Sequence, residues 1–371
     1  MKDPRVNRVA RNLLSHSVRL QPGEKILVQA SVEAKPLVKE LLKEIYALGA
    51  LPFVQLTDSQ ISRELLMGVS EEQLKLMAEF DLVRMKAMDA YISISALTNS
   101  TYLADVPQAK KMLHSELYTV PVHFKERIEN TKWVITTYPT DSMAQAANMS
   151  YDAYEDFYFN TSCLDYSKMD KAMDPLVDIL QLTDVVRITG QGTNISFSIK
   201  GMPAIKCSGQ VNIPDGEVYT APILDSVNGV ISYNTPAVYM GKTFENIRLE
   251  FKDGKIIDAS ANNTEDINRI FDTDTGARYI GEFAIGVNPY IVNPMKNTLF
   301  DEKICGSFHF TPGSAYTECD NGNDSAVHWD LVCIQRPDFG GGEMWFDNKL
   351  VRKDGIFIID ELKPLNPENL K

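Results

Sequence analysis

The pattern of expected strands and helices changes near Thr183, and this change constrains the fold more than any other feature of the 371-residue chain. Before Thr183, apolar β-prone runs alternate with helical stretches. The runs expected to form strands are Lys25–Ala30, Leu51–Leu56, Ala90–Ala96 and Lys132–Tyr138. Strands and helices that alternate at this spacing predict β-α units around a parallel sheet. Residues 1–182 are therefore predicted to form an α/β domain with a mainly parallel sheet.

After Thr183 the chain consists of short β-prone runs separated by turn signals. Examples of these signals are Pro214-Asp215-Gly216, Asp253-Gly254 and Gly340-Gly341-Gly342. A single helical segment is expected at Glu265–Phe271. Residues 183–371 are therefore predicted to form a β-rich α+β domain.

Composition and motif absences exclude several function classes. The first expected strand is not followed by Gly-x-Gly-x-x-Gly, and no Walker motif is present, so a nucleotide fingerprint is absent. The net charge of −13 argues against a nucleic-acid partner, because phosphate binding requires a basic face. We expect neither a signal peptide nor a membrane span. Five scattered cysteines without a Cys-x-x-Cys pair indicate reduced thiols and a cytoplasmic protein.

Polar residues at five positions of the second domain are candidates for a metal site. In Ser325–Ile334, interpreted as a strand, alternation places His328 and Asp330 on one side and Trp329 on the other. The remaining candidates are Glu217 after the Pro214–Gly216 turn, Glu282 in an apolar run and His309 between two phenylalanines. Each alone has an ordinary structural explanation, such as an exposed edge glutamate or a hydrogen-bonded core histidine. Together, two glutamates, two histidines and an aspartate match the ligand set of a two-metal hydrolase.

The remaining titratable residues receive plainer interpretations. Glu302 is a candidate to support the metal ligands or to assist proton transfer, but we expect it instead to be an exposed partner of Lys303. His16, His114 and His123 lie in the helical N-terminal half and are interpreted as structural or surface residues.

Several motifs of this chain, in this order, resemble one family of peptidases. They are Pro214–Val218, Gly281–Gly286, Leu299–Lys303 with Gly306–His309, and His328-Trp329-Asp330. The similarity also includes Tyr138-Pro139-Thr140 and the expected strand pair at Arg187–Gly201, so it covers most of the chain. The family is that of aminopeptidase T, aminopeptidase S and PepS, peptidase family M29. The chain departs from it in a shorter linker at Thr317–Asp324.

The resemblance implies an activity, a metal and site roles. Members of the family are metal-dependent exopeptidases that remove N-terminal amino acids from peptides with a pair of Zn²⁺ or Co²⁺ ions, and they form homodimers. By resemblance, Glu217, Glu282 and His309 are ligands of one ion, whereas Glu282, His328 and Asp330 are ligands of the other. Glu282 then bridges the two ions and is a catalytic residue. Tyr316 matches a family tyrosine near the metals that stabilises the oxyanion, although a core tyrosine explains the same residue.

Two other functions compete with the peptidase. His309, His328 and Asp330 alone form the two-histidine, one-carboxylate set of mononuclear non-haem Fe(II) enzymes, and a ring-cleaving dioxygenase resembles this family in that reduced form. Glu217 and Glu282 favour the peptidase, because a mononuclear iron site does not use them. The second alternative is a binding module without enzymatic activity, against which the intact ligand set argues.

Overall fold

The computed structural model describes residues 3–371 and divides them into two compact units. Unit 1 contains the chain up to Cys163 together with Gly209–Pro214, and unit 2 contains Leu164–Ser208 and Asp215–Lys371. Among the described residues, no helix has both the length and the apolar content needed to cross a bilayer.

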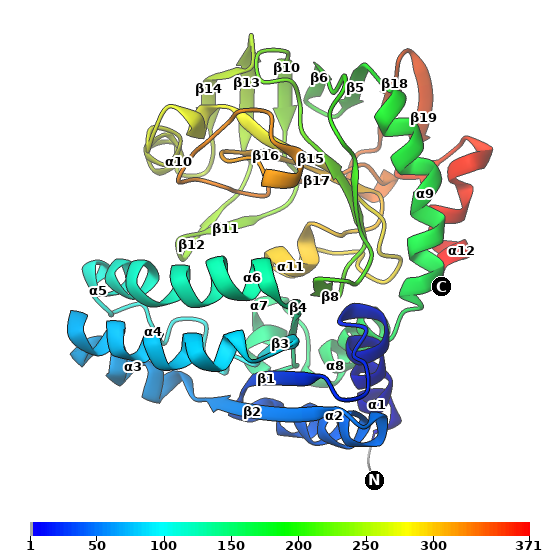
Figure 1. Ribbon diagram of the computed structural model, residues 1–371. Helices are drawn as coiled ribbons and strands as arrows, with labels where there is room; N and C mark the ends of the chain where they lie inside the picture. The colour runs from blue at the N-terminus through cyan, green and yellow to red at the C-terminus, as the bar shows by residue number, and fades with distance from the viewer. Residues whose placement is uncertain (1–2) are drawn as a thin grey trace. The chain divides into compact units, whose positions relative to one another are not determined.

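Unit 1 is an α/β unit around a parallel sheet (Figure 1). Its strands are β1 (Lys25–Ser31), β2 (Leu51–Thr57), β3 (Ala90–Ser95), β4 (Lys132–Thr137) and β8 (Asn212–Ile213), in the order β2-β1-β3-β4-β8. Its helices are α1 (Pro4–Arg11), η1 (Asn12–Ser17), η2 (Val32–Ala34), α2 (Lys35–Leu48), α3 (Ser59–Gly68), α4 (Glu71–Lys86), α5 (Gln108–His114), η3 (Ser115–Arg127), α6 (Ile128–Asn130), α7 (Asp141–Ala146) and α8 (Tyr151–Ser162). The predicted parallel sheet is confirmed, because each neighbouring pair of these strands is parallel.

One face of this sheet is covered by α4 and η3. Leu27 and Tyr91 from the sheet are buried against Ala78 and Met85 of α4 and Val122 of η3. Gly49 ends α2 with a φ of 80°, a left-handed conformation that glycine adopts without steric cost. The turn at Gly49 lets the chain enter β2 directly.

Unit 2 is built mainly from antiparallel sheets. Its strands are β5 (Val185–Gly190), β6 (Thr193–Ser198), β7 (Ile205–Cys207), β9 (Glu217–Thr220), β10 (Asn228–Ser232), β11 (Ala237–Tyr239), β12 (Lys242–Phe244), β13 (Arg248–Lys252), β14 (Lys255–Ser260), β15 (Ile280–Gly286), β16 (Ser307–Pro312), β17 (Val332–Ile334), β18 (Gly342–Phe346), β19 (Lys349–Lys353) and β20 (Ile356–Phe357). They form an eight-stranded sheet, β14-β13-β10-β6-β5-β18-β19-β20, a five-stranded sheet, β17-β16-β15-β9-β7, and the pair β11-β12.

Helical segments connect and flank these sheets. They are α9 (Tyr166–Leu182), α10 (Thr264–Phe271), η4 (Gly276–Arg278), α11 (Thr298–Asp301), η5 (Thr317–Cys319), η6 (Pro337–Phe339), η7 (Asp360–Leu365) and α12 (Pro367–Leu370). The expectation of a single helical segment after Thr183 is therefore wrong. The predicted segment is present as α10, but α11, α12 and several short 3-10 turns also lie in this part of the chain. Helix α9 precedes Thr183 and does not bear on that expectation.

Phenylalanine side chains join the two large sheets of unit 2. Phe197 of β6 contacts Phe283 of β15 and Phe310 of β16, with ring centroids 5.0 and 4.9 Å apart. Phe251 of β13 also packs on Phe310. Because successive residues of a strand point to opposite faces, Glu282 and His309 lie on the face of the five-stranded sheet that is turned away from this core.

The division into units differs from the expected boundary after residue 182. Helix α9 contacts β7, β9 and η7, so its apolar residues, including Met173 and Leu176, are buried in unit 2. The segment Gly209–Pro214 returns to unit 1, where β8 pairs with β4 over only two residues. So short a pairing leaves no hydrophobic pattern from which it can be predicted.

Candidate metal centre

Neighbouring strands bring three of the predicted ligands onto one face. The order β16-β15-β9 places His309, Glu282 and Glu217 on adjacent strands. Glu282 pairs with Thr311, and Ala284 pairs with both His309 and Tyr219. The alternation of side chains along these strands therefore places the three residues on the same face.

A bulge at Gly281 adjusts the position of Glu282. The register between β15 and β16 shifts between Ile280 and Glu282. A Cβ atom at residue 281 would lie 2.3 Å from the carbonyl oxygen of Gly313, so only glycine fits this approach. Gly281 thus lets β15 pass close to the end of β16 while the next side chain enters the site.

The segment that carries His328 and Asp330 is less regular than expected. The strand β17 covers only Val332–Ile334, and His328 forms an isolated bridge with Gly313. The regular strand is therefore shorter than the expected one over Ser325–Ile334. Before Val332 only scattered backbone hydrogen bonds join the segment to β16, from Phe310 N–H to Leu331 and from Trp329 N–H to Pro312. Trp329 is buried against Tyr239 and Phe244, whereas His328 and Asp330 lie beside Glu282, so the two sides of the segment differ as predicted.

Four of the five predicted ligands form a compact group. Glu282 Oε1 lies 3.3 Å from His309 Nε2, and Glu282 Oε2 lies 3.4 Å from His328 Nε2. His328 Nε2 is also 3.3 Å from Asp330 Oδ1. Glu282 and His309 are only 3% and 1% exposed, which makes this a buried group of ionisable side chains. We call these four residues the Glu282 group.

Hydrogen bonds outside the group orient its members. His328 Nδ1 lies 2.8 Å from the carbonyl oxygen of Ser314, and His309 Nδ1 lies 3.3 Å from that of Glu302. An Nδ1–H that donates to a carbonyl leaves Nε2 as the free acceptor, which is the common arrangement of metal-binding histidines. Thr311 Oγ1 donates to Asp330 Oδ1 over 2.9 Å and fixes that carboxylate.

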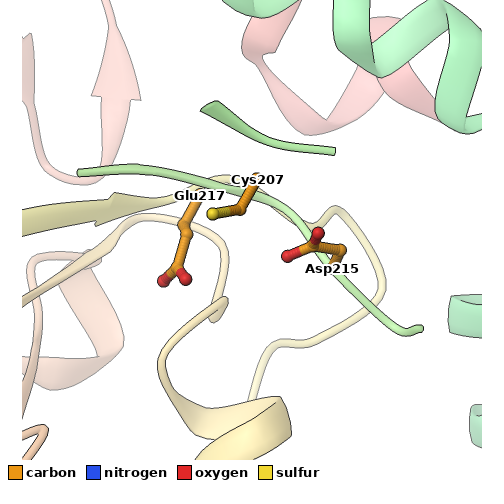
Figure 2. Close-up of side chains that lie close together, drawn as sticks. All are labelled: Cys207, Asp215 and Glu217. Carbon is orange, nitrogen blue, oxygen red and sulfur yellow. The ribbon is translucent and has the colours of Figure 1, made fainter. Parts of the chain in front are cut away.

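Glu217, the fifth predicted ligand, lies beside the group in a different environment. Its Oε2 is 3.7 Å from Nδ1 of His309, on the side of the ring opposite Glu282. Figure 2 shows its carboxylate together with the Cys207 thiol and the Asp215 carboxylate, whose possible ligand atoms all lie within 4.8 Å of one another. Lys303 Nζ is 3.6 Å from Glu217 Oε1 and 3.9 Å from Asp215 Oδ1.

Sequence reasoning missed Lys303. Glu302 was expected to be its exposed partner, and the two residues do form an ion pair, but the Lys303 side chain is completely buried and that of Glu302 is only 15% exposed. The local sequence gives no signal for this burial, because Lys303 directly follows the acidic residues Asp301 and Glu302. We call Lys303, Cys207, Asp215 and Glu217 the Lys303 group.

The pKa values of the buried groups are strongly shifted. Burial raises the pKa of Glu217 to about 7, although the Lys303 ammonium acts in the opposite direction. Burial alone would lower the pKa of His328, but the carboxylates of Asp330 and Glu282 raise it to about 11. The pKa of Asp330 is held below its usual range because the His328 imidazole outweighs the effect of burial. In the metal-free protein, protonated His328 therefore supplies the positive charge beside these carboxylates.

The donor atoms present fit a divalent metal ion. Among residues 3–371, Glu217 Oε2 is a buried carboxylate oxygen without a hydrogen-bond partner, a costly state that a bound cation relieves. One ligand atom each from Glu282, His309 and Asp330 lies within 4.8 Å of the others. Imidazole nitrogens and carboxylate oxygens are suitable ligands for Zn²⁺ and Co²⁺, whose binding displaces the imidazole protons.

Tyr316 lies at the edge of the Glu282 group. Its ring centroid is 4.8 Å from that of His328, and the residue is 46% exposed. Desolvation and the carboxylates of Glu282 and Asp330 raise the pKa of its hydroxyl, so the phenol keeps its proton. The exposed fraction does not match a residue buried in the core, and it leaves the side chain accessible from solvent.

Comparisons with known proteins identify the family. The model of the thermophilic metalloprotease (M29) family matches residues 2–356. The chain belongs to this family.

Individual M29 relatives agree with this membership. The chain is 27% identical to aminopeptidase 2 of Geobacillus stearothermophilus over 91% of this chain and 92% of that one. It is 26% identical to aminopeptidase PepS of Streptococcus thermophilus over 86% of each chain. The solved structure of wild-type AmpT from Thermus thermophilus has the same fold, with a TM-score of 0.79, 21% identity and coverage of 96% of this chain and 99% of that one. The resemblance seen in the motifs is thus confirmed, and none of these relatives supports the dioxygenase alternative.

Proposed function

We propose that this M29 protein removes N-terminal amino acids from small peptides with a pair of divalent ions, Zn²⁺ or Co²⁺. Its family and its aminopeptidase relatives make it a metal-dependent aminopeptidase, a hydrolase. The number and identity of the ions, the ligand set and the peptide substrates are the parts that we add.

The position of Glu282 carries this proposal. Its two carboxylate oxygens face different imidazoles, Oε1 toward His309 and Oε2 toward His328. A carboxylate placed between two imidazoles is suited to bridge two cations, with His309 and Glu217 on one side and His328 and Asp330 on the other. The Glu217 carboxylate lies on the far side of the His309 ring and next to Lys303. To bind the same ion as His309, its side chain must therefore rotate away from Lys303.

The chemistry follows from the charges of these side chains. Bound ions would lower the pKa of a water molecule and polarise the scissile carbonyl. The free α-amino group of the substrate would bind an ion or a carboxylate of the site, which restricts cleavage to the N-terminus. The Tyr316 hydroxyl, which keeps its proton, can donate a hydrogen bond to the oxyanion that develops on the carbonyl.

A pair of substrates tests the requirement for a free amino group. Leucyl-p-nitroanilide should release its chromophore in the presence of added Co²⁺ or Zn²⁺. N-acetyl-leucyl-p-nitroanilide has the same leaving group but no charged amine, so its turnover should be lost. Equal hydrolysis of both substrates would contradict an aminopeptidase.

Metal content tests the ion pair. Elemental analysis of the purified protein should find two zinc or cobalt equivalents per chain, and anomalous scattering from crystals should place both beside Glu282. One equivalent of iron would instead support the dioxygenase. Asp330→Asn should lower the metal content as well as the rate, because it weakens one ligand.

We further propose a homodimer in the cytoplasm. Strand β2 lies at the edge of its sheet and exposes apolar side chains on both faces, with Phe53 43%, Val54 41% and Leu56 46% exposed. Exposed apolar edge strands favour association with a partner. Light scattering should give twice the chain mass, and a monomeric mass would refute the dimer.

A further inference from the structure

Unit 1 contains a row of polar side chains on a sheet face that should be apolar. Gln29 of β1 is aligned with Gln55 of β2 and with Ser93 of β3. All three lie on the face covered by α4 and η3, one step closer to the strand ends than Leu27 and Tyr91. Strands of a parallel sheet are normally buried by apolar residues on both faces. Gln29 and Gln55 each accept one hydrogen bond, from the Tyr91 hydroxyl and from Arg84, so each side-chain amide keeps N–H donors available to a ligand.

The polar row forms the floor of a cavity of about 720 Å³. The cavity lies where ligands commonly bind in open α/β sheets. The strand order β2-β1-β3-β4 reverses direction between β1 and β3, and ligands bind at such reversals, beyond the carboxyl ends of the strands. The volume lies within the range of small-molecule sites.

The helix that covers this cavity has an unusual conformation. Residues Ser115–Arg127 form a π-helix of 13 residues with Pro121 inside it. The π conformation is rare and occurs often at functional sites. Tyr118, His123 and Arg127 from this helix all line the cavity.

Arg127 is the feature that points to a ligand. The residue is 6% exposed, and its Nε and Nη1 atoms have no hydrogen-bond partner among the described residues. Its guanidinium carbon lies 4.5 Å from the ring centroid of Trp133 and 5.2 Å from that of Tyr91. These rings hold the group in place but cannot satisfy its N–H donors, and a buried charge without a hydrogen-bonded partner is costly.

Nearby groups do not replace the missing anion. The Asp81 carboxylate accepts from Arg84 and from the Tyr118 hydroxyl. Asp58 accepts from two backbone N–H groups at the start of α3. Burial lowers the pKa of His123 to about 4, so this imidazole is neutral at pH 7.

We propose that this cavity, the Arg127 pocket, binds a small organic carboxylate with an apolar body. The guanidinium offers parallel N–H donors that match a carboxylate. Leucine, isoleucine, methionine and phenylalanine side chains form much of the remaining lining, among them Leu65, Met77 and Phe124. Inorganic phosphate does not use these apolar contacts, whereas an acid with an aliphatic or aromatic chain does. The pocket belongs wholly to unit 1, so the inference does not depend on the peptidase assignment.

Calorimetry with 4-phenylbutyrate and its neutral amide tests the proposal. The full chain is first treated with chelator, so that the acid cannot bind a metal ion in unit 2. One equivalent of the acid should bind per chain. The affinity for 4-phenylbutanamide should be lower by a factor of about ten or more, because the amide lacks the charge-assisted hydrogen bonds. This comparison requires no variant and therefore no assumption about folding. Equal binding of the acid and the amide, or no saturable binding of the acid at millimolar concentration, would overturn the proposal.

Two variants locate the site. Arg127→Met should weaken acid binding about tenfold or more, and Arg127→Lys should retain part of it, because the charge remains without the fork of donors. Arg11→Met, which removes an exposed arginine of the same unit, is the matched control and should bind like the unaltered chain. Unchanged acid binding by a folded Arg127→Met protein would refute the assignment.

Discussion

The two groups of buried ionisable residues in unit 2 differ in how their negative charge is balanced. In the Glu282 group, imidazoles face the carboxylates, and an imidazole can release its proton to become a metal ligand. In the Lys303 group, an ammonium bound to the chain faces Asp215 and Glu217. An ammonium has no lone pair to offer a metal, so it acts as a permanent cation. The carboxylates of the Glu282 group are therefore suited to bind metal ions, whereas those of the Lys303 group are already balanced by the lysine ammonium.

Metal removal should separate the two groups most strongly. We expect a chelator to abolish leucyl-p-nitroanilide hydrolysis, because the Glu282 group loses its cations, and added Co²⁺ to restore it. Far-UV circular dichroism should change little, since Lys303 and protonated His328 still balance the carboxylates. Full activity in excess chelator would contradict the metal centre, and unfolding on chelation would contradict the role given to the fixed cation.

The next largest effect is expected for Glu282→Gln. The change removes the negative charge between the two imidazoles. Turnover should fall by more than about a hundredfold, a larger loss than is typical when a residue that only hydrogen-bonds to a metal ligand is replaced. Glu265→Gln, an exposed position in α10 of the same unit, is the matched control. Normal turnover of a folded Glu282→Gln protein would show that this group is not the active site.

Lys303→Met should act on stability. Removing one partner of a buried ion pair leaves uncompensated charge, so the free energy of unfolding should fall by about 3–5 kcal/mol. Urea denaturation of the metal-free protein measures this loss. Lys200→Met, at a side chain that is 76% exposed, should change the free energy of unfolding far less. Equal stability of the two variants would refute the comparison between the groups.

The smallest effect is expected for Tyr316→Phe. If the hydroxyl stabilises the oxyanion, kcat should fall by about 10- to 100-fold, less than for a fully enclosed donor. KM and the urea midpoint should hardly change, because the ring remains. Tyr290→Phe in the same unit provides the control. A lower urea midpoint with unchanged kcat would instead identify Tyr316 as a packing residue.

The regular parts of the fold were predictable from the sequence. Apolar runs located β1 to β4, and single polar residues in apolar surroundings identified Glu282 and His309 as candidates for a site. The spacing of Glu217, Glu282 and His309 did not itself show that their strands are neighbours. That inference required the family resemblance, since strand order depends on pairings between distant segments.

Other features had no local signal. The two-residue strand β8 and the short β17 depend on backbone pairing that hydrophobic periodicity does not report. Lys303 resembles a surface lysine in sequence, and only the three-dimensional structure shows that Asp215 and Glu217 surround its ammonium. The empty space beside Arg127 is likewise a property of packing between η3 and the sheet.

The ammonium of Lys303 has a consequence for how the protein matures. Because the chain supplies part of the positive charge that its own carboxylates need, we expect it to fold before it binds an ion. Ion binding, and not folding, would then be the step after which activity appears.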